Sequence, residues 1–190
     1  HSKKLYTITL HDKEGVVSDG ITAELKEKFK VQFDAKNGTP VPNPQYIENG
    51  GKVEEPSVSY TGFNLVGWYT EDSYTNKWDF SNNTVTSNIT LYAQWTASDN
   101  TQYKVKHYKQ NIGDDGYPAT PSDTDNLQGT TGADASVTLK NYPGFEAGEY
   151  TPASIAPDGS TVVEVRYKRK TYSVEFGVNG SNGNIAVTSV

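Results

Sequence analysis

Residues 60–70 read YTGFNLVGWYT, and a shorter version of this stretch returns at residues 142–151 as YPGFEAGEYT. Both contain Tyr-x-Gly-Phe, then a second glycine, then x-Tyr-Thr. A return of this kind indicates a repeated structural unit. Gly62 and Gly144 can supply a backbone conformation that residues with a side chain resist, and the phenylalanine after each is expected to open a strand and fill a core. The pattern predicts small β modules rather than a catalytic set.

Strand patterns extend outward from these two stretches. Residues 21–33 alternate apolar and polar side chains, which predicts two strands placed nearly end to end with a break near residues 26–28. Opening strands with the order aromatic, polar, β-branched, polar, large recur at residues 6–10, 29–33, 103–107 and 172–176. Closing strands recur at residues 89–95 and 161–167.

These recurrences predict two complete units, at residues 28–97 and 102–169. Residues 1–27 are then the C-terminal part of a preceding β module, and residues 170–190 are the start of a following one, with turn signals at 179–180 and 182–183.

The order of elements inside each unit follows from the same patterns. In the first unit we expect a strand to residue 35, a turn at Asn37 and Gly38, a short strand at 51–53, the Gly-Phe strand, and the closing strand. In the second unit a longer acidic link precedes a strand at 135–140. The length of each unit and the spacing of its strands are typical of a β-grasp-like module.

The composition narrows the functional classes. The chain has 190 residues, a formal net charge of -6 and no cysteine, so neither a disulfide framework nor a thiolate metal site can form. Nucleic-acid binding needs clustered lysine and arginine, and no such stripe is present. No apolar run is long enough to cross a membrane. Because residue 1 is His, we expect this chain to be a fragment of a longer protein.

The first unit resembles the Listeria–Bacteroides repeat, the B-repeat of internalin-type surface proteins. The residues that carry the resemblance are VQFDA (31–35), NGTP (37–40), GGKV (50–53), Gly62-Phe63, VGWYT (66–70), KWDF (77–80) and ITLYAQW (89–95). The stretch at 36–38, Lys-Asn-Gly, departs from the family's usual Asn-Gly-Gly turn. The resemblance implies a β-grasp-like, ubiquitin-like module with little helix, found in tandem in bacterial surface and secreted proteins.

The second unit is similar to mucin-binding-protein-type (MucBP-like) repeats. Its carriers are YKVKHY (103–108), LQG (127–129), YPGF (142–145) and DGSTVVEVRY (158–167). Repeats of this type are again β-grasp-like and serve in adhesins. Neither family has a catalytic motif that could be carried over to this chain.

A search for catalytic and metal-binding motifs returns no enzyme class. The sequence lacks the zinc-hydrolase, nucleophile-elbow and P-loop patterns. His107 occupies a position where other opening strands carry Phe33 or Leu10, so we expect a packed, hydrogen-bonded histidine. Residues 123–126 resemble the first third of a calcium loop, but the later acidic ligand is missing, which favours a mobile acidic loop. We therefore predict a non-catalytic protein without metal or cofactor.

Candidate binding surfaces are an edge strand open to strand addition, the loops at residues 71–88 and 110–134, and a set of aromatic side chains. Tyr69 and Tyr92 are out of phase with the core positions of their strands, so we expect them to be exposed and available to a ligand, as a sugar-stacking platform. The other motif residues are assigned to structure: Gly62, Phe63, Gly67, Trp68, Trp78, Phe80, Trp95, Gly144 and Phe145.

The sequence thus predicts a mainly β chain of tandem β-grasp-like modules in an elongated arrangement. The expected role is a stalk or spacer in a secreted or cell-surface protein of a Gram-positive or related bacterium. The alternative is an adhesin-type module that recognises host mucin, a glycan or a surface protein, with an association to virulence. A monomer that does not insert into a membrane is expected.

Overall fold

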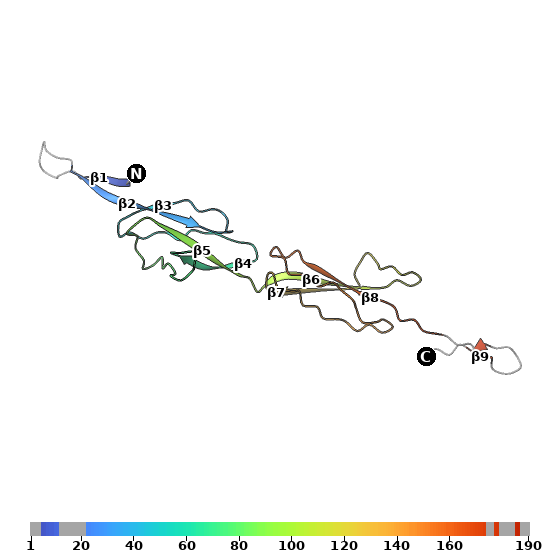
Figure 1. The fold of residues 1–190 in the computed structure, drawn as a ribbon. Coiled ribbons are helices and arrows are strands. Elements are labelled where there is room, and N and C mark those ends of the chain that lie inside the picture. Colours follow the sequence, from blue (N-terminus) through green and yellow to red (C-terminus); the bar gives the residue numbers. More distant parts are fainter. Residues whose placement is uncertain (1–4, 12–21, 174–176, 179–184, 187–190) are drawn as a thin grey trace. The chain divides into compact units, whose positions relative to one another are not determined.

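The computed structural model describes residues 5–11, 22–173, 177–178 and 185–186. The chain divides after Asp99 into two compact units, and each unit is described by itself. The described residues form ten strands and no helix, which confirms the predicted mainly β fold (Figure 1). The turn signals predicted at 179–180 and 182–183 lie outside the described residues.

The first unit holds one five-stranded sheet. Its strands are β1 (Leu5–His11), β2 (Thr22–Asp34), β3 (Gln45–Glu48), β4 (Phe63–Tyr69) and β5 (Ile89–Ala97). They follow the order β1-β2-β5-β4, with β3 also paired to β2. The β2–β5 pair is parallel, and the other pairs are antiparallel.

Two strand predictions in this unit are wrong. β2 runs without the break expected near residues 26–28, because its first part pairs with β1 and its second part pairs with β3 and β5. The backbone therefore has a partner along its whole length. No strand forms at residues 51–53. The pairing strand is β3, while Val53 is buried in an irregular segment that covers the sheet.

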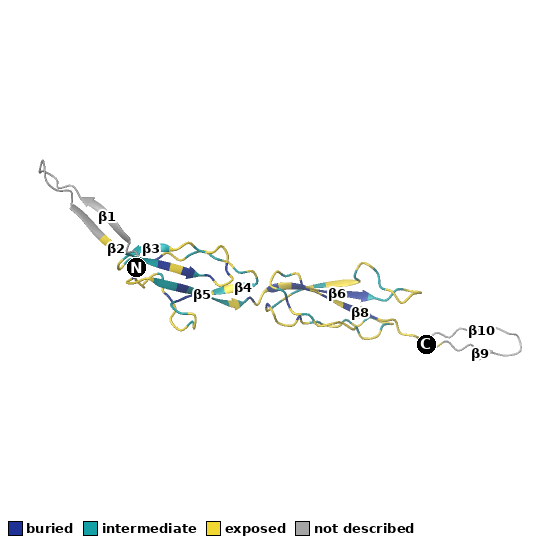
Figure 2. Cartoon of the chain, turned by 45° about the horizontal axis from the view of Figure 1, so that its top comes forward, coloured by how far each residue is buried: buried dark blue, intermediate teal, exposed yellow. Residues whose placement is uncertain are grey.

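The core of the first unit lies on one face of the sheet. The buried residues are Val31, Phe33, Ala35, Val53, Trp68, Trp78, Val85, Leu91 and Ala93. Val53, Trp78 and Val85 come from irregular segments, so loops rather than a helix close this face. Dark blue positions on β2 and β5 mark it in Figure 2.

The second unit holds a three-stranded sheet of β6 (Thr101–Lys109), β7 (Asp123–Gly129) and β8 (Val162–Tyr167), in the order β7-β6-β8. β6 and β7 are antiparallel, while β6 and β8 are parallel. β9 (Gly177–Val178) and β10 (Ile185–Ala186) form a separate antiparallel pair. The core contains Tyr103, Val105, Ala135, Ile155, Val163, Val165 and Tyr167.

The second strand of this unit is not where the sequence predicted it. Residues 135–140 are irregular, and the strand is β7, which lies in the stretch expected to be a mobile acidic loop. The register places acidic β7 beside basic β6, with His107 opposite Asp123 and Lys106 opposite Thr124. Asp123 and Asp125 share the face of the sheet that carries His107, and they bond there to Tyr142, His107 and Lys140, which stabilises the pairing of a segment that is poor in β-formers.

The Tyr-x-Gly-Phe turn recurs with the same hydrogen bonds in both units. The N–H of Phe63 donates to the Tyr60 carbonyl over 2.9 Å, and the N–H of Phe145 donates to the Tyr142 carbonyl over 3.1 Å. The central glycines have φ of 77° and 80°, in the region that favours glycine. The glycine carbonyl in each turn also accepts an N–H from just after the closing strand.

The two turns continue differently. Phe63 opens β4, as predicted, but Phe145 opens no strand. Phe145 and Glu149 make isolated bridges to Arg169 and Arg166 instead.

Candidate functional site

Tyr69 and Tyr92, the two predicted ligand-binding residues, lie next to each other. They are cross-strand partners on β4 and β5, and Tyr92 is also opposite Asp34 on β2. Directly opposed residues share one face of a sheet. Trp68 is opposite Ala93 in the core, so the two tyrosines lie on the outer face.

Tyr69 is not exposed as predicted: only 8% of its surface is accessible. The loop that follows β4 covers it. Lys77 bridges back to Tyr69, the Thr70 N–H donates to the Asn76 carbonyl, and the Tyr74 ring meets the Tyr69 ring edge-on at 5.5 Å. Strand alternation gave the correct face for Tyr69 but could not show that a loop covers that face.

Tyr92 is half-buried and lies under a charged side chain. The Lys36 ammonium lies 5.1 Å from the centre of the Tyr92 ring. The same ammonium is 2.8 Å from an Asp72 carboxylate oxygen and 3.2 Å from Asp34. We call Lys36, Tyr69, Tyr74, Tyr92 and the two aspartates the tyrosine cluster.

Charge within the tyrosine cluster is held in place by hydrogen bonds. The bond to Asp72, and then the bond to Asp34, raise the pKa of Lys36. The bond from Lys36 lowers the pKa of Asp72. The raised pKa of Lys36 and the lowered pKa of Asp72 keep this ion pair charged at neutral pH.

The structural motif residues of the first unit have clear packing roles. Trp68 is fully buried and Trp78 is 7% exposed, while Phe80 packs against the same core. The Trp95 indole N–H donates to the Ala35 carbonyl over 3.0 Å. Its ring meets Tyr60 edge-on at 5.8 Å, and Tyr60 stacks on Phe63 at 4.2 Å.

Gly67 lies at a bulge of β4 and has a positive φ, which favours glycine. The β4–β5 register shifts between Leu65 and Gly67, and the Lys77 ammonium donates to the Val66 carbonyl over 2.6 Å. A Cβ at Gly67 would lie 2.3 Å from Lys77 Cε, and the φ of Gly67 is 151°. A β-bulge of this kind typically leaves carbonyls outside the ladder, and here a lysine satisfies one of them.

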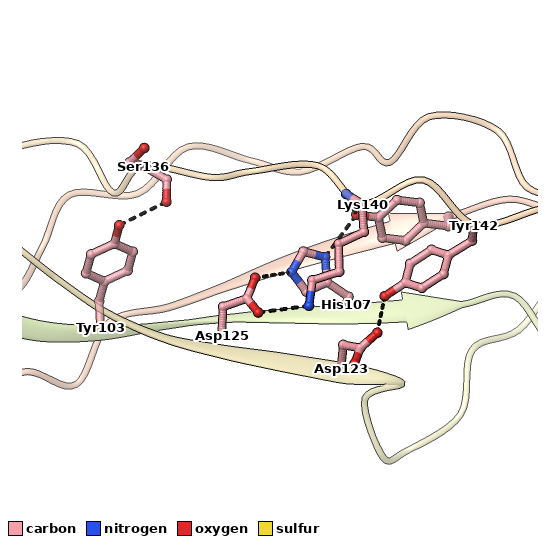
Figure 3. Close-up of polar contacts among 8 residues, drawn as sticks. Tyr103, His107, Asp123, Asp125, Ser136, Lys140 and Tyr142 are labelled. Atoms are coloured by element: carbon pink, nitrogen blue, oxygen red, sulfur yellow. Dashed lines mark hydrogen bonds and ion pairs between the residues drawn. The ribbon is translucent and has the colours of Figure 1, made fainter.

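A second polar centre lies in the second unit around His107, which is fully buried. His107 Nδ1 is 2.9 Å from the Tyr167 hydroxyl, and Nε2 is 3.0 Å from Asp125 Oδ2. The Lys140 ammonium donates to Asp125 Oδ1 over 2.8 Å, as Figure 3 shows. We call His107, Asp125, Lys140 and Tyr167 the His107 network. The prediction of a packed, hydrogen-bonded histidine is confirmed.

The ionisable groups around the His107 network are shifted by hydrogen bonds. Lys140, and then His107, lower the pKa of Asp125. The Tyr142 hydroxyl donates to Asp123 Oδ2 over 2.5 Å and lowers its pKa. Burial, and then this bond, raise the pKa of Tyr142. Asp125 and Lys140 form an ion pair, and the buried His107 ring is bonded at both nitrogens, so the network links β6, β7 and β8 to the segment at Lys140.

Among the described residues, no group of three or more His, Asp or Glu side chains is placed to hold a metal ion. The partial calcium-loop pattern at residues 123–126 is part of β7, and its two aspartates bond to Tyr142, His107 and Lys140.

Comparison with known proteins identifies the class of the first unit. Residues 29–94 match the model of the Listeria-Bacteroides repeat domain, a family found in surface proteins. This match confirms the resemblance that residues 31–95 carry. The resemblance of residues 102–169 to MucBP-type repeats stays a prediction.

Two curated relatives come from Evansella cellulosilytica. One, named "Putative membrane protein", is 33% identical over 90 residues, which is 47% of this chain and 13% of that protein. The other, named "Putative Gly-rich membrane protein", is 33% identical over 69 residues, or 36% of this chain and 8% of its own length. The chain therefore corresponds to a small part of each relative. No helix among the described residues has the length and apolarity to cross a membrane.

Proposed function

We propose that this chain is a non-catalytic repeat segment of a bacterial surface or secreted protein, in which it acts as a spacer that presents other domains. A surface-protein repeat family at residues 29–94 and similarity to short parts of much longer proteins support this role. In the first unit Lys36 is bonded to Asp72, and in the second unit His107 and Lys140 are bonded to Asp125, so these groups serve internal contacts.

The observation that carries the proposal is the anchored connection between the units. At one end, the Ser98 N–H donates to the Gly62 carbonyl over 2.9 Å. At the other end, the hydroxyls of Thr101 and Thr131 are 2.7 Å apart in a buried contact. Only Asp99 and Asn100 lie between the anchored residues. A connection this short leaves little chain to act as a flexible linker.

Spin-label distances test the spacer role. Because the chain has no cysteine, Gln32→Cys on β2 and Lys104→Cys on β6 give one label in each unit at exposed strand positions. We expect a narrow distance distribution. Inserting about six Gly and Ser residues between Asp99 and Asn100 should broaden it. A distribution in the unmodified chain as broad as in the insertion variant would contradict the spacer role.

The second candidate is the adhesin-type module, and the tyrosine cluster favours it. A half-buried Tyr92 beside two exposed carboxylates offers both an aromatic surface and hydrogen-bond acceptors for sugar hydroxyls. The MucBP-like resemblance of the second unit supports host mucin as the ligand class. A host glycan or a surface protein remains the other partner of this proposal.

A mucin and glycan array tests the adhesin role. Binding by the labelled chain should be lost in Tyr92→Ala and kept in Tyr46→Ala, an exposed tyrosine on β3. Because Tyr69 is buried, Tyr69→Phe is the informative change there, and Tyr69→Ala is expected to disturb the fold. Absence of saturable binding would remove this candidate and leave the spacer role unaffected.

A further inference from the structure

One edge of β8 is unpaired over the first part of the strand. The Lys104 N–H donates to the Thr161 carbonyl, and the Gln110 N–H donates to the Tyr167 carbonyl, so odd-numbered residues face β6. Even-numbered residues face away from β6 because successive residues of a strand direct their N–H and C=O groups to opposite sides. Arg166 exchanges two bonds of 2.9 Å with Glu149. Among the described residues, none supplies a backbone partner to the outward groups of Val162 and Glu164.

The neighbouring segment explains why the edge stays open. After Glu149 the chain turns toward the segment at residues 133–135: the Ala135 N–H donates to the Ala153 carbonyl, and the Ile155 N–H donates to the Ala133 carbonyl. Continued pairing with β8 would place residue 151 opposite Glu164, but the chain has already left this line. Pro152 has no N–H to donate.

The gap between β8 and the departing segment is a groove of about 770 Å³. Tyr117, Tyr150, Pro152 and Val162 give it apolar walls, and Tyr150 and Val162 are each 41% exposed. Its charged groups include Glu164, whose carboxylate is 3.2 Å from Arg166. Both side chains of this ion pair are about half exposed, so the pair is weak and can exchange partners.

The first unit shows what fills the corresponding position. There β4 leaves the same Tyr-x-Gly-Phe turn and pairs antiparallel with the closing strand β5, from Ala97 to Tyr92. In the second unit the closing strand has the turn but lacks this added strand.

We propose that the open edge of β8 binds an extended peptide as an added antiparallel strand, with a cationic residue opposite Glu164 and an aliphatic residue opposite Val162. Strand addition matches unpaired N–H and C=O groups of the edge with those of the peptide. Opposite charges and β-branched pairs are favoured between directly opposed residues. This interaction goes beyond the spacer role and does not depend on it.

The probe is the capped peptide acetyl-Thr-Thr-Lys-Thr-Val-Thr-Thr-amide, in which Lys falls opposite Glu164 and Val falls opposite Val162. It is titrated into the ¹⁵N-labelled full chain and followed by amide NMR. We expect saturable shifts at Val162, Glu164 and Tyr150, and slower hydrogen exchange of the first two amides. Absence of saturable shifts there would overturn the proposal.

Matched peptides separate strand addition from general adhesion. N-methylation of the Lys and Val amides, which face β8, should abolish binding. N-methylation of the Thr between them should leave binding unchanged, because that N–H points away from β8. Equal binding by both methylated peptides would overturn the proposal.

A charge swap on the protein tests the register. Glu164→Lys should lower the affinity for the Lys peptide about five-fold. A peptide with Glu in place of Lys should bind this variant with the affinity that was lost. Because Glu164 is exposed on an edge, the change should leave the fold intact, which the unshifted core amides of Val163 and Val165 would verify. Sedimentation without peptide tests whether a second copy of the chain occupies the edge instead. A dimer that Glu164→Lys dissociates would assign the edge to that second copy and overturn the proposal. The spin-label distances report on the spacer role independently of all these outcomes.

Discussion

The two units place the same glycine turn beside a closing strand that is parallel to the opening strand, and they finish the sheet differently. In the first unit β4 continues from the turn and pairs along β5. In the second unit the chain makes two isolated bridges near the end of β8 and then leaves it. A shared turn therefore fixes where the chain starts along the closing strand, but not how far it stays paired.

The cores of the two units also differ, in the polarity of the side chains that they bury. The first core is apolar and aromatic around Trp68 and Phe33, whose rings meet edge-on at 5.2 Å. The second core encloses the fully buried His107, bonded at both ring nitrogens. The first unit gains stability mainly from packing, and the second adds a polar network in which each member depends on its partners.

The largest expected effect is the loss of the Trp68 ring. Trp68→Ala should destabilise the first unit by about 3–5 kcal/mol, because it removes a fully buried aromatic side chain and leaves a cavity. All three tryptophans, Trp68, Trp78 and Trp95, lie in the first unit, so urea unfolding followed by tryptophan fluorescence reports on that unit. Amide NMR of β6 and β8 should show the second unit unchanged. Joint unfolding of both units would contradict their separate stability.

The next effect belongs to the second unit. His107→Phe inserts the side chain that the first unit carries at Phe33, and it should cost about 1–3 kcal/mol because Asp125 and Tyr167 each lose a buried partner. Amide-detected urea unfolding of β6 measures it. Lys106→Ala, on the same strand, is the matched control and should have a small effect. A more stable His107→Phe variant would show that the network restricts the fold rather than stabilising it.

The two glycine turns should respond alike. Gly62→Ala and Gly144→Ala force a side chain into a positive φ and should each cost about 1–2 kcal/mol in their own unit. No atom lies within 4 Å of a Cβ added at Gly144, so the cost there comes from the backbone conformation alone and not from a clash. Unfolding midpoints of the two variants, read separately for each unit, make the comparison. Clearly unequal costs would mean that the turns are not equivalent.

The smallest effect is a response of the second unit to acid. The pKa of Asp125 is lowered by Lys140 and then by His107. Its contribution is therefore fully present above the unfolded-state value of about 3.9, and it is lost as pH falls through the lower folded-state pKa. Asp125→Asn should flatten the pH dependence of unfolding of the second unit below about pH 4. The first unit should keep its own acid response, through Asp72 among others. An unchanged profile for the second unit would show that Asp125 is not a main source of its acid sensitivity.

Local sequence by itself determined the mainly β class, the repeated turn at Gly62 and Gly144, and five strands close to their predicted places: β1, β4, β5, β6 and β8. These features depend on side-chain alternation and on glycine conformation, which are local properties. The assignment of Trp68 and Trp78 to the core followed from the same patterns and the family resemblance.

The tertiary structure alone decided which strands are paired and which faces are covered. β7 is a strand because Asp123 and Asp125 find distant partners in Tyr142, His107 and Lys140, and Tyr69 is buried because a loop folds back over it. The open edge of β8 arises because the segment after Glu149 pairs elsewhere. Each of these features depends on a partner distant in the chain, and the period of one segment does not specify that partner.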